Sequence, residues 1–182
     1  MTTASKWRVV VDGDDDASGS GTLTAEMLAA RLWDEGEFFP WVESVDGGEG
    51  TEATHIPEVR AILLSNPLRV ARAWLKHTRR PEWLFLWVMD LCEALPDEAW
   101  PLILALVEVA RTDIELACVV AGPLEQLVRC NGHQVIGRIE AEAATNERFR
   151  LALSGVWRSS IPKSVWDRLL AAVGEGPTLD DC

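Results

Sequence analysis

The sequence predicts a mainly all-α protein whose helices form a compact multi-helix bundle or a short α-solenoid-like stack of antiparallel helices. Three observations favour this fold. From Pro57 onward, apolar residues recur at helical spacing, residues that start and end helices fall between the apolar stretches, and the connections are short. No repeat of fixed period accompanies them, so a true repeat array is left as an alternative.

Residues 1–56 are expected to form an acidic N-terminal segment with a short strand, one helix and a mobile loop. Trp7–Val11 is a short β-like run, and Thr24 can cap a helix over about residues 25–35. The Gly- and Glu-rich stretch Glu43–Thr54 is typical of a loop.

Residues 57–173 are expected to form the helical core domain. Pro57 suits the first position of a helix, because proline lacks the amide hydrogen that this position leaves unpaired. Asn66 can cap the next helix, with Pro67 at its first position, and we expect that helix to reach Arg79.

Two central helices are expected to follow, the first opening at Pro81 and the second capped by Asp97. Their apolar stretches, Trp83–Met89 and Trp100–Val109, are apolar on nearly every side. Such helices lie in the middle of a helical domain.

The second half of the core is marked by one cap and two helix stops. Thr112 can cap a helix over Asp113–Ala121, Gly122-Pro123 ends it and starts the next, and Asn131-Gly132 is a left-handed stop signal. The remaining helices are expected over His133–Ala144, Glu147–Leu153 and Pro162–Val173, followed by a frayed tail over residues 174–182.

The net charge of −12 is concentrated at the front of the chain, where residues 1–58 hold 13 acidic and three basic side chains. An acidic surface attracts basic partners and disfavours nucleic acid. No apolar run approaches the roughly 20 residues of a membrane helix, and the polar N-terminus carries no export signal. We therefore expect a cytoplasmic protein without a membrane partner.

Four cysteines stand at positions 92, 118, 130 and 182, with no close pair. We expect reduced core cysteines, as in a cytosolic protein. Cys130 and His133 form one short-spaced pair of metal-ligand type, but zinc sites need a second pair. Neither a metal nor a cofactor is expected.

Asp12 and Asp14 follow the predicted strand in a way that resembles the nucleophile and general acid of haloacid-dehalogenase phosphatases. Those enzymes also need a parallel sheet, and no βαβ pattern follows residue 57. A calcium loop would need Gly and Glu where Ala17 and Leu23 stand. A solvated acidic loop is the preferred interpretation, and a metal-dependent hydrolase using Asp12 and Asp14 is an alternative.

The stretch Arg60–Arg80 holds six bases and no acid. Five of them share one predicted helix face: Arg69, Arg72, Lys76, Arg79 and Arg80. This basic stripe could bind an anionic ligand, form a solvated face, or dock the acidic front of the same chain.

Aromatic residues predict both core and surface positions. Tryptophans at helical spacing within apolar runs, namely Trp74, Trp83, Trp87 and Trp100, are expected in the core. Trp41 stands in a loop beside two phenylalanines and is an interface candidate. The predicted partner-binding residues are Asp14, Asp15, Asp16, Phe38, Phe39 and Trp41.

A recurring pattern runs from about Asp113 to Trp166. It reads Glu115-Leu-Ala117, Ala121-Gly-Pro-Leu-Glu125-x-Leu127, Gly132, Arg138-Ile-Glu140, Phe149-Arg150-x-Ala-Leu153, Val156-Trp157 and Val165-Trp166. This pattern resembles a bacterial family of small helical proteins recorded as a domain of unknown function. The resemblance implies a helical fold and a bacterial source, and it supplies no activity.

Charged residues of this pattern are expected to form an interhelical ion network, with a polar groove as the alternative. The predicted members are Glu115, Glu125, Arg138 and Glu140, together with Arg148 and Arg150.

The function expected from these features is non-enzymatic binding of another, basic protein in the bacterial cytoplasm. An immunity or antitoxin-like inhibitor of a basic toxin fits best, because it needs only a scaffold and a complementary surface. The alternatives are the hydrolase above and a helical scaffold that holds an anionic ligand on the basic stripe.

Overall fold

The computed structural model of the chain describes most of its residues. The described ranges are 7–10, 23–34, 41–44, 51–76, 82–158 and 160–179. By their internal contacts, residues 1–66 with 81–83 form a first unit, and residues 67–80 with 84–182 form a second. The sequence predicts a division after residue 56. The observed division falls later because helix α2 (Pro57–Leu64) packs against helix α1 (Ala25–Asp34).

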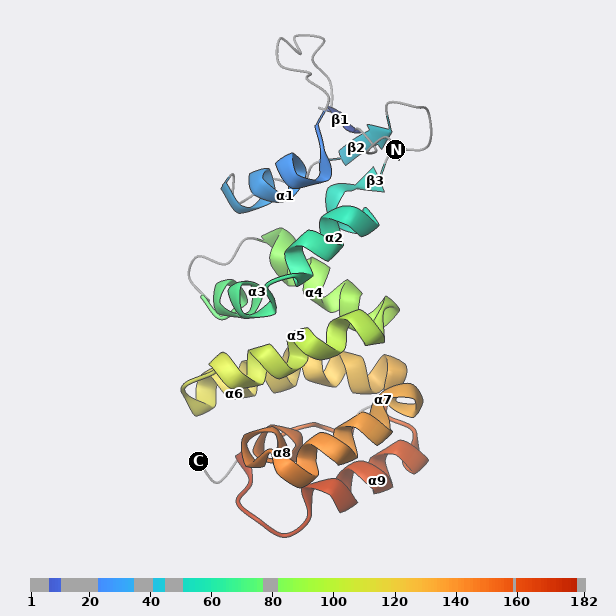
Figure 1. Ribbon diagram of the computed structural model, residues 1–182. Coiled ribbons are helices and arrows are strands. Elements are labelled where there is room, and N and C mark those ends of the chain that lie inside the picture. The colour runs from blue at the N-terminus through green and yellow to red at the C-terminus, as the bar shows by residue number, and fades with distance from the viewer. Residues whose placement is uncertain are drawn as a thin grey trace. The chain divides into compact units, whose positions relative to one another are not determined.

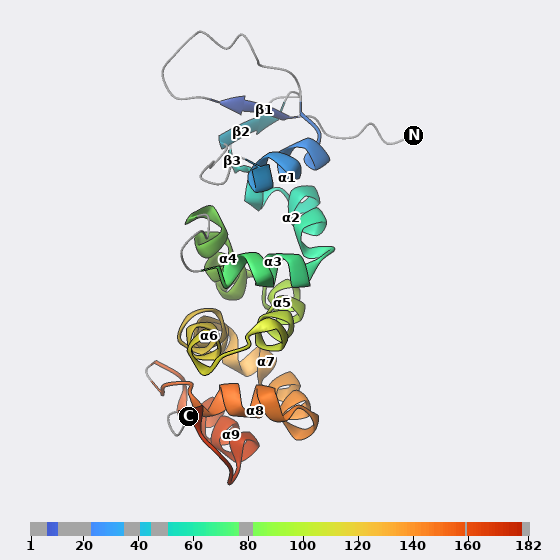
Figure 2. The ribbon, with the colours of Figure 1, turned by 90° about the vertical axis from the view of Figure 1, so that its left-hand side faces the viewer.

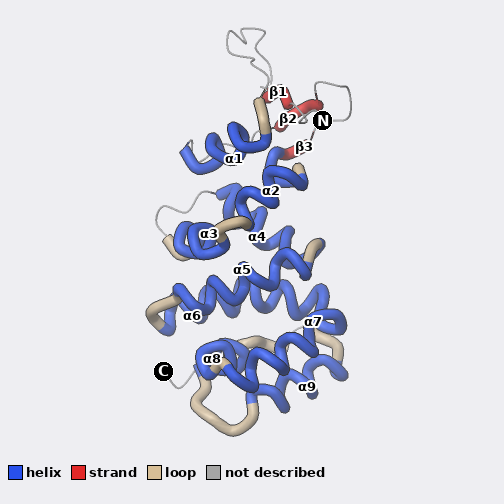
Figure 3. Tube along the Cα trace, viewed as in Figure 1, coloured by secondary structure: helices blue, strands red, loops and turns tan. Residues whose placement is uncertain are grey.

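The described strands lie in the first unit, where they form a three-stranded antiparallel sheet of order β1-β2-β3 (Figure 3). They are β1 (Trp7–Val10), β2 (Trp41–Ser44) and β3 (Thr51–Glu52), followed by the 3-10 helix η1 (Ala53–His55). The predicted strand is confirmed. The prediction of a loop over Glu43–Thr54 is wrong at both ends, where β2 ends and where β3 and η1 lie. Strands this short hold too few residues for an alternation of apolar and polar side chains to be recognised in the sequence.

The register of the sheet places Trp7 opposite Ser44. Leu23 also pairs with Trp7: its amide donates to the Trp7 carbonyl at 2.7 Å, and the Trp7 amide donates back at 2.9 Å. The chain therefore enters α1 directly from the sheet. Thr24 caps α1 as predicted, because its Oγ1 accepts from the Met27 amide at 3.4 Å.

Helices α1 and α2 bury apolar faces of helical spacing. Leu28 and Leu32 in α1, and Val59 and Leu63 in α2, are buried at i, i+4 positions. This spacing brings one stripe of each helix into the core of the first unit.

The second unit is helical throughout its described part, with α5 between α3 and α7 (Figures 1 and 2). Its helices are α3 (Pro67–Trp74), α4 (Glu82–Ala94), α5 (Pro96–Val109), α6 (Asp113–Val119), α7 (Glu125–Thr145), α8 (Glu147–Ser154) and α9 (Lys163–Val173), with a short turn η2 (Val120–Leu124) before α7. The first residues of α4 belong to the first unit. The mainly helical fold class is confirmed, and none of the described helices has the length and apolar character of a membrane span.

The aromatic core largely follows the prediction. Trp74, Trp83 and Trp87 are buried, and Trp100 is half-buried. Trp83 meets Trp33 edge to face, with ring centroids 5.6 Å apart, inside the first unit. This ring contact therefore contributes to the core of the first unit.

Two helix boundaries on α3 and α5 differ from the prediction. α3 ends at Trp74, earlier than predicted. α5 begins at Pro96, so Asp97 lies in its first turn and does not cap it. There the Asp97 carboxylate accepts a hydrogen bond from Arg138 on α7 at 2.5 Å.

The predicted helix stop at Asn131-Gly132 is a kink inside α7 instead. Asn131 has φ −127° and ψ 17°, and its side-chain amide donates to the carbonyls of Cys92 and Glu93 at 2.9 and 2.8 Å. These two bonds hold α7 against the end of α4, so the helix resumes after one irregular residue.

Candidate functional site

An apolar groove of the second unit lies beside α6. Its volume is about 520 Å³. The lining residues are Thr112, Asp113, Ile114, Ala117, Val120, Ala121, Gly155, Trp157 and Leu179. They come from the start of α6 through η2, from the connection after α8 and from the C-terminal segment, so three separate stretches of the chain build one surface.

Two large apolar side chains stand exposed at this groove. Ile114 is 76% exposed and Trp157 is 74% exposed. Buried core residues of the same types, such as Ile103 and Trp74, are at most 1% exposed. The contrast matters because a contiguous exposed apolar patch marks an interaction surface more often than a scattered single residue does.

A capping box fixes the start of α6 and with it the position of Ile114. Thr112 Oγ1 accepts from the Glu115 amide at 3.1 Å, and Glu115 Oε2 accepts from the Thr112 amide at 3.1 Å. Glu115 Oε2 also accepts from the Arg111 amide at 2.6 Å. The predicted Thr112 cap is confirmed, and Glu115 serves in it as the reciprocal partner.

Small residues keep the floor of the groove open. Ala117 and Ala121 lie on its lining, and Gly122-Pro123 separates α6 from α7 as predicted. Gly155 permits the C-terminal segment to approach: a Cβ at Gly155 would lie 2.7 Å from Leu179 Cδ2. The Leu179 amide donates to Ser154 Oγ at 2.9 Å, so the tail predicted to fray from residue 174 packs back on α8 at Leu179.

The described lining of this groove is mainly apolar, and Asp113 is the charged residue among those described. Acid–base or nucleophilic catalysis needs convergent titratable groups, and the described lining brings no second such group to Asp113. Among the described residues, no group of three His, Cys, Asp or Glu side chains could hold a metal ion.

A second groove, of about 440 Å³, lies at the ends of α3 and α5. It is lined by Arg72, Leu75, Lys76, Glu108, Val109, Arg111 and Glu115. Two members of the predicted basic stripe, Arg72 and Lys76, therefore meet here. Arg69 is not in the lining, and Arg79 and Arg80 lie outside the described residues.

The residues predicted to bind a partner at the N-terminus are not placed by the structure. Asp12, Phe38, Phe39 and the aspartates Asp14 to Asp16 lie outside the described residues. Trp41 belongs to β2, but its side chain is not described. The predicted partner surface and the alternative hydrolase site therefore remain predictions.

The predicted ion network is resolved into separate contacts. Arg138 pairs with Asp97, and Glu140 accepts two hydrogen bonds from Arg168 on α9, at 2.7 and 2.5 Å. The Arg168 hydrogen bond lowers the pKa of Glu140. Glu125 stands at the start of α7, where a carboxylate favours the helix dipole.

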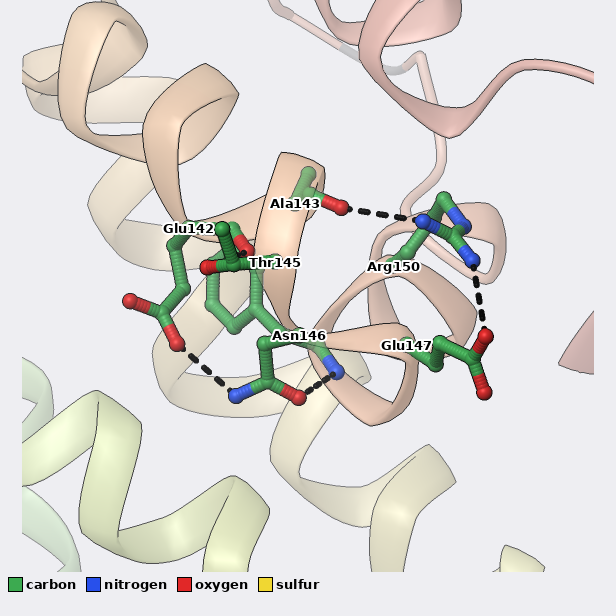
Figure 4. Close-up of polar contacts among 7 residues, drawn as sticks. Glu142, Ala143, Thr145, Asn146, Glu147 and Arg150 are labelled. Atoms are coloured by element: carbon green, nitrogen blue, oxygen red, sulfur yellow. Dashed lines mark hydrogen bonds and ion pairs between the residues drawn. The ribbon is translucent and has the colours of Figure 1, made fainter.

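The corner between α7 and α8 gathers further polar groups (Figure 4). Asn146 Oδ1 accepts from the Phe149 amide at 3.0 Å, and its Nδ2 donates to Glu142 Oε1 at 2.8 Å. Arg150 donates to the Ala143 carbonyl at 3.1 Å. These polar groups are hydrogen-bonded to one another, which indicates that they stabilise the connection between α7 and α8.

The described cysteines are free thiols in three environments. Cys92 is buried, Cys118 half-buried and Cys130 exposed, so the prediction of core cysteines is correct for Cys92 and wrong for Cys130. Burial raises the pKa of Cys92 to about 12.

Ile114, Trp157 and Leu179 were not among the residues predicted to form a site. The one signal in the sequence was the family-like pattern, which contains Ala117, Ala121 and Trp157, and all three line the apolar groove. A family model described as a family of unknown function, DUF6869, matches residues 73–176. No curated protein and no solved structure matches the chain.

Proposed function

The chain belongs to this family of unknown function, DUF6869, and we propose from its apolar groove beside α6 that it is a non-enzymatic module that binds another protein there. The observation that carries the proposal is the exposure of Ile114 and Trp157, 76% and 74%, on the edge of one groove. The family match covers every residue of that groove except Leu179.

The energetics favour a protein as the occupant. Tryptophan is over-represented among the few interface residues that carry most of the binding energy, and truncating such a residue costs about 2 kcal/mol or more. Trp157 and Ile114 would both lose contact with water on binding. Small lining residues, Ala117 and Ala121, leave room for an apolar side chain of the partner.

A basic protein is the partner that the charge of the chain favours. The net charge of −12 speeds the approach of a cationic partner, and Asp113 places a carboxylate on the groove itself. The specific form of the proposal is an immunity or antitoxin-like inhibitor of a basic toxin in the bacterial cytoplasm. It needs no catalytic group and only one complementary surface.

The proposal is tested with the full-length chain as bait in a lysate of its source cell. The captured partner is identified and purified, and its dissociation constant is measured by calorimetry against wild type, W157A and L170A. Leu170 is a matched control, because it is 50% exposed but lies on α9, outside the groove. We expect a basic partner, binding weakened by about 30-fold or more in W157A, and little change in L170A.

Two results would count against the proposal. If the partner binds W157A and L170A with equal affinity, the groove beside α6 is not the interface. A partner that is acidic or neutral, with affinity independent of salt, would remove the basic-toxin form but leave the groove in place.

A further inference from the structure

The second groove collects cationic side chains from two connections of the helical unit. Arg72 comes from the last turn of α3, Lys76 from the residues after it, and Arg111 from the connection between α5 and α6. Only the first two belong to the stripe visible in the sequence. The fold adds Arg111, which lies 35 positions or more further along the chain.

These three cations are uncommitted within the part of the chain that the structure describes. Their side chains have no hydrogen bond or ion pair there. Other arginines of the unit are engaged: Arg138 binds Asp97, and Arg168 binds Glu140. Three uncommitted cations around one cavity repel one another, and an anion relieves that repulsion.

Two carboxylates share the groove with the cations but differ in availability. Glu115 Oε2 is occupied by the backbone amides of Arg111 and Thr112. Glu108 is exposed at the end of α5 and has no described partner. The groove therefore has a cationic surplus together with one carboxylate that can accept a hydrogen bond from a ligand.

The dimensions and lining match a small ligand. About 440 Å³ lies in the range of small-molecule pockets, and Leu75 and Val109 provide apolar contact. Arginine holds phosphate through two parallel hydrogen bonds, which lysine supplements as a point charge. The net charge of −12 is concentrated in residues 1–58, whereas residues 59–182 hold 16 acidic and 14 basic side chains, so the part of the chain that contains this groove repels anions only weakly.

We propose that this groove binds a small phosphate ester, with Arg72, Lys76 and Arg111 on the phosphate and Glu108 on a hydroxyl group of the esterified part. This groove is distinct from the protein-binding groove beside α6, because the two share no lining residue.

The test measures binding of three probes to the full-length protein at constant ionic strength: inorganic phosphate, ribose 5-phosphate and ribose. Calorimetry and the rise in melting temperature report affinity. We expect ribose 5-phosphate to bind more tightly than inorganic phosphate, and ribose not to bind. The double variant R72Q/R111Q is expected to bind ribose 5-phosphate about tenfold or more weakly than wild type, because two charge-assisted contacts with the phosphate are lost.

A charge-matched control is R129Q/R158Q, which removes two exposed arginines that do not line the groove. It is expected to bind ribose 5-phosphate like wild type. E108Q is expected to bind inorganic phosphate as wild type does. Its affinity for ribose 5-phosphate should exceed its affinity for inorganic phosphate by a smaller factor than in wild type. This second variant tests the site even where R72Q/R111Q lowers stability.

Three outcomes overturn the proposal. One is the absence of any binding up to about 10 mM probe, beyond which affinity is too weak to be specific. Another is an equal loss in both double variants, which would indicate a general charge effect. The third is a lower melting temperature in R72Q/R111Q with no phosphate-dependent change in wild type, which would show that the cations only offset the partial negative charge at the ends of α3 and α5.

Discussion

Gly132 on α7 and Val165 on α9 pack so closely that a Cβ added at Gly132 would lie 2.8 Å from Val165 Cγ1 and 3.3 Å from Cγ2. Both residues are buried, and α7 and α9 are in extensive contact. Glycine at position 132 therefore sets the distance between these two helices.

The substitution Gly132→Ala is expected to lower the free energy of unfolding by about 1–2 kcal/mol, because overpacking outweighs the better helix propensity of alanine. Gly137→Ala on the same helix is the control, since its Cβ would meet nothing within 4 Å. G137A should raise the free energy of unfolding by about 0.5–1 kcal/mol. Urea denaturation measures both, and changes of the same sign would contradict the close packing.

Asn146 joins α7 to α8 through both ends of its side-chain amide (Figure 4). N146A removes the acceptor of the Phe149 amide, and we expect it to cost about 1 kcal/mol of stability. N146S should recover most of that loss, because serine also caps helices but cannot donate to Glu142. Equal melting temperatures for wild type and N146A would exclude a capping role.

The fold could be read from the sequence wherever a local signal decides the structure. Thr112 and Gly122-Pro123 act within one turn of the helices they bound, and the structure confirms them. At Asn131 the sequence located the interruption but not its form: the chain kinks there and α7 resumes, while the Asn131 side-chain amide donates to the carbonyls of Cys92 and Glu93, far away in sequence. Helix propensity cannot register such a partner.

The candidate site was less predictable than the fold. Ile114 and Leu179 meet at one groove only after α6 and the C-terminal segment take their places. A helical period indicates that a helix has an apolar face, but not whether that face stays uncovered. Arg111 joins Arg72 for the same reason, since the turn after α5 brings it there.

The pair Glu140–Arg168 predicts a specific pH dependence. Arg168 lowers the pKa of Glu140 in the folded protein, so the pair stabilises the fold above the pKa of an unfolded glutamate, about 4.3. The contribution is lost as the pH falls through the lower, folded pKa. E140Q should therefore melt below wild type at neutral pH, and the gap should close in acid.

The melting temperatures of wild type and E140Q are compared by calorimetry across the acidic range. E175Q serves as the control, because Glu175 is exposed and has no described ion pair. If the difference in melting temperature between wild type and E140Q stays constant with pH, ionisation of Glu140 is not its cause.

Cysteine alkylation should separate the described thiols. Cys130 is exposed, whereas Cys92 is buried with a pKa raised to about 12. In the native protein near pH 8, iodoacetamide should modify Cys130 faster than Cys92 by about a hundredfold, because thiolate is the reactive form. Peptide mass spectrometry assigns the rates without substitutions, and unfolding in urea should equalise them. Rapid native labelling of Cys92 would contradict its burial.

Arg148 on α8 binds the end of α5 rather than the ion network predicted for it. Its Nε donates to the Val107 carbonyl at 3.1 Å, and its guanidinium also donates to the Ala110 carbonyl. The last carbonyls of a helix lack hydrogen-bond donors within the helix, and Arg148 supplies donors to two carbonyls at the end of α5.

R148M should keep the packing of the aliphatic stem and lose both hydrogen bonds, lowering the free energy of unfolding by about 2–3 kcal/mol. R148K should recover part of this, since lysine can reach one carbonyl but lacks the fork that serves two. Arg129→Met, on an exposed arginine of α7, provides the matched control and should change stability by at most about 0.5 kcal/mol. If R148M and R129M denature at the same urea concentration, the contacts of Arg148 with α5 contribute nothing to the fold.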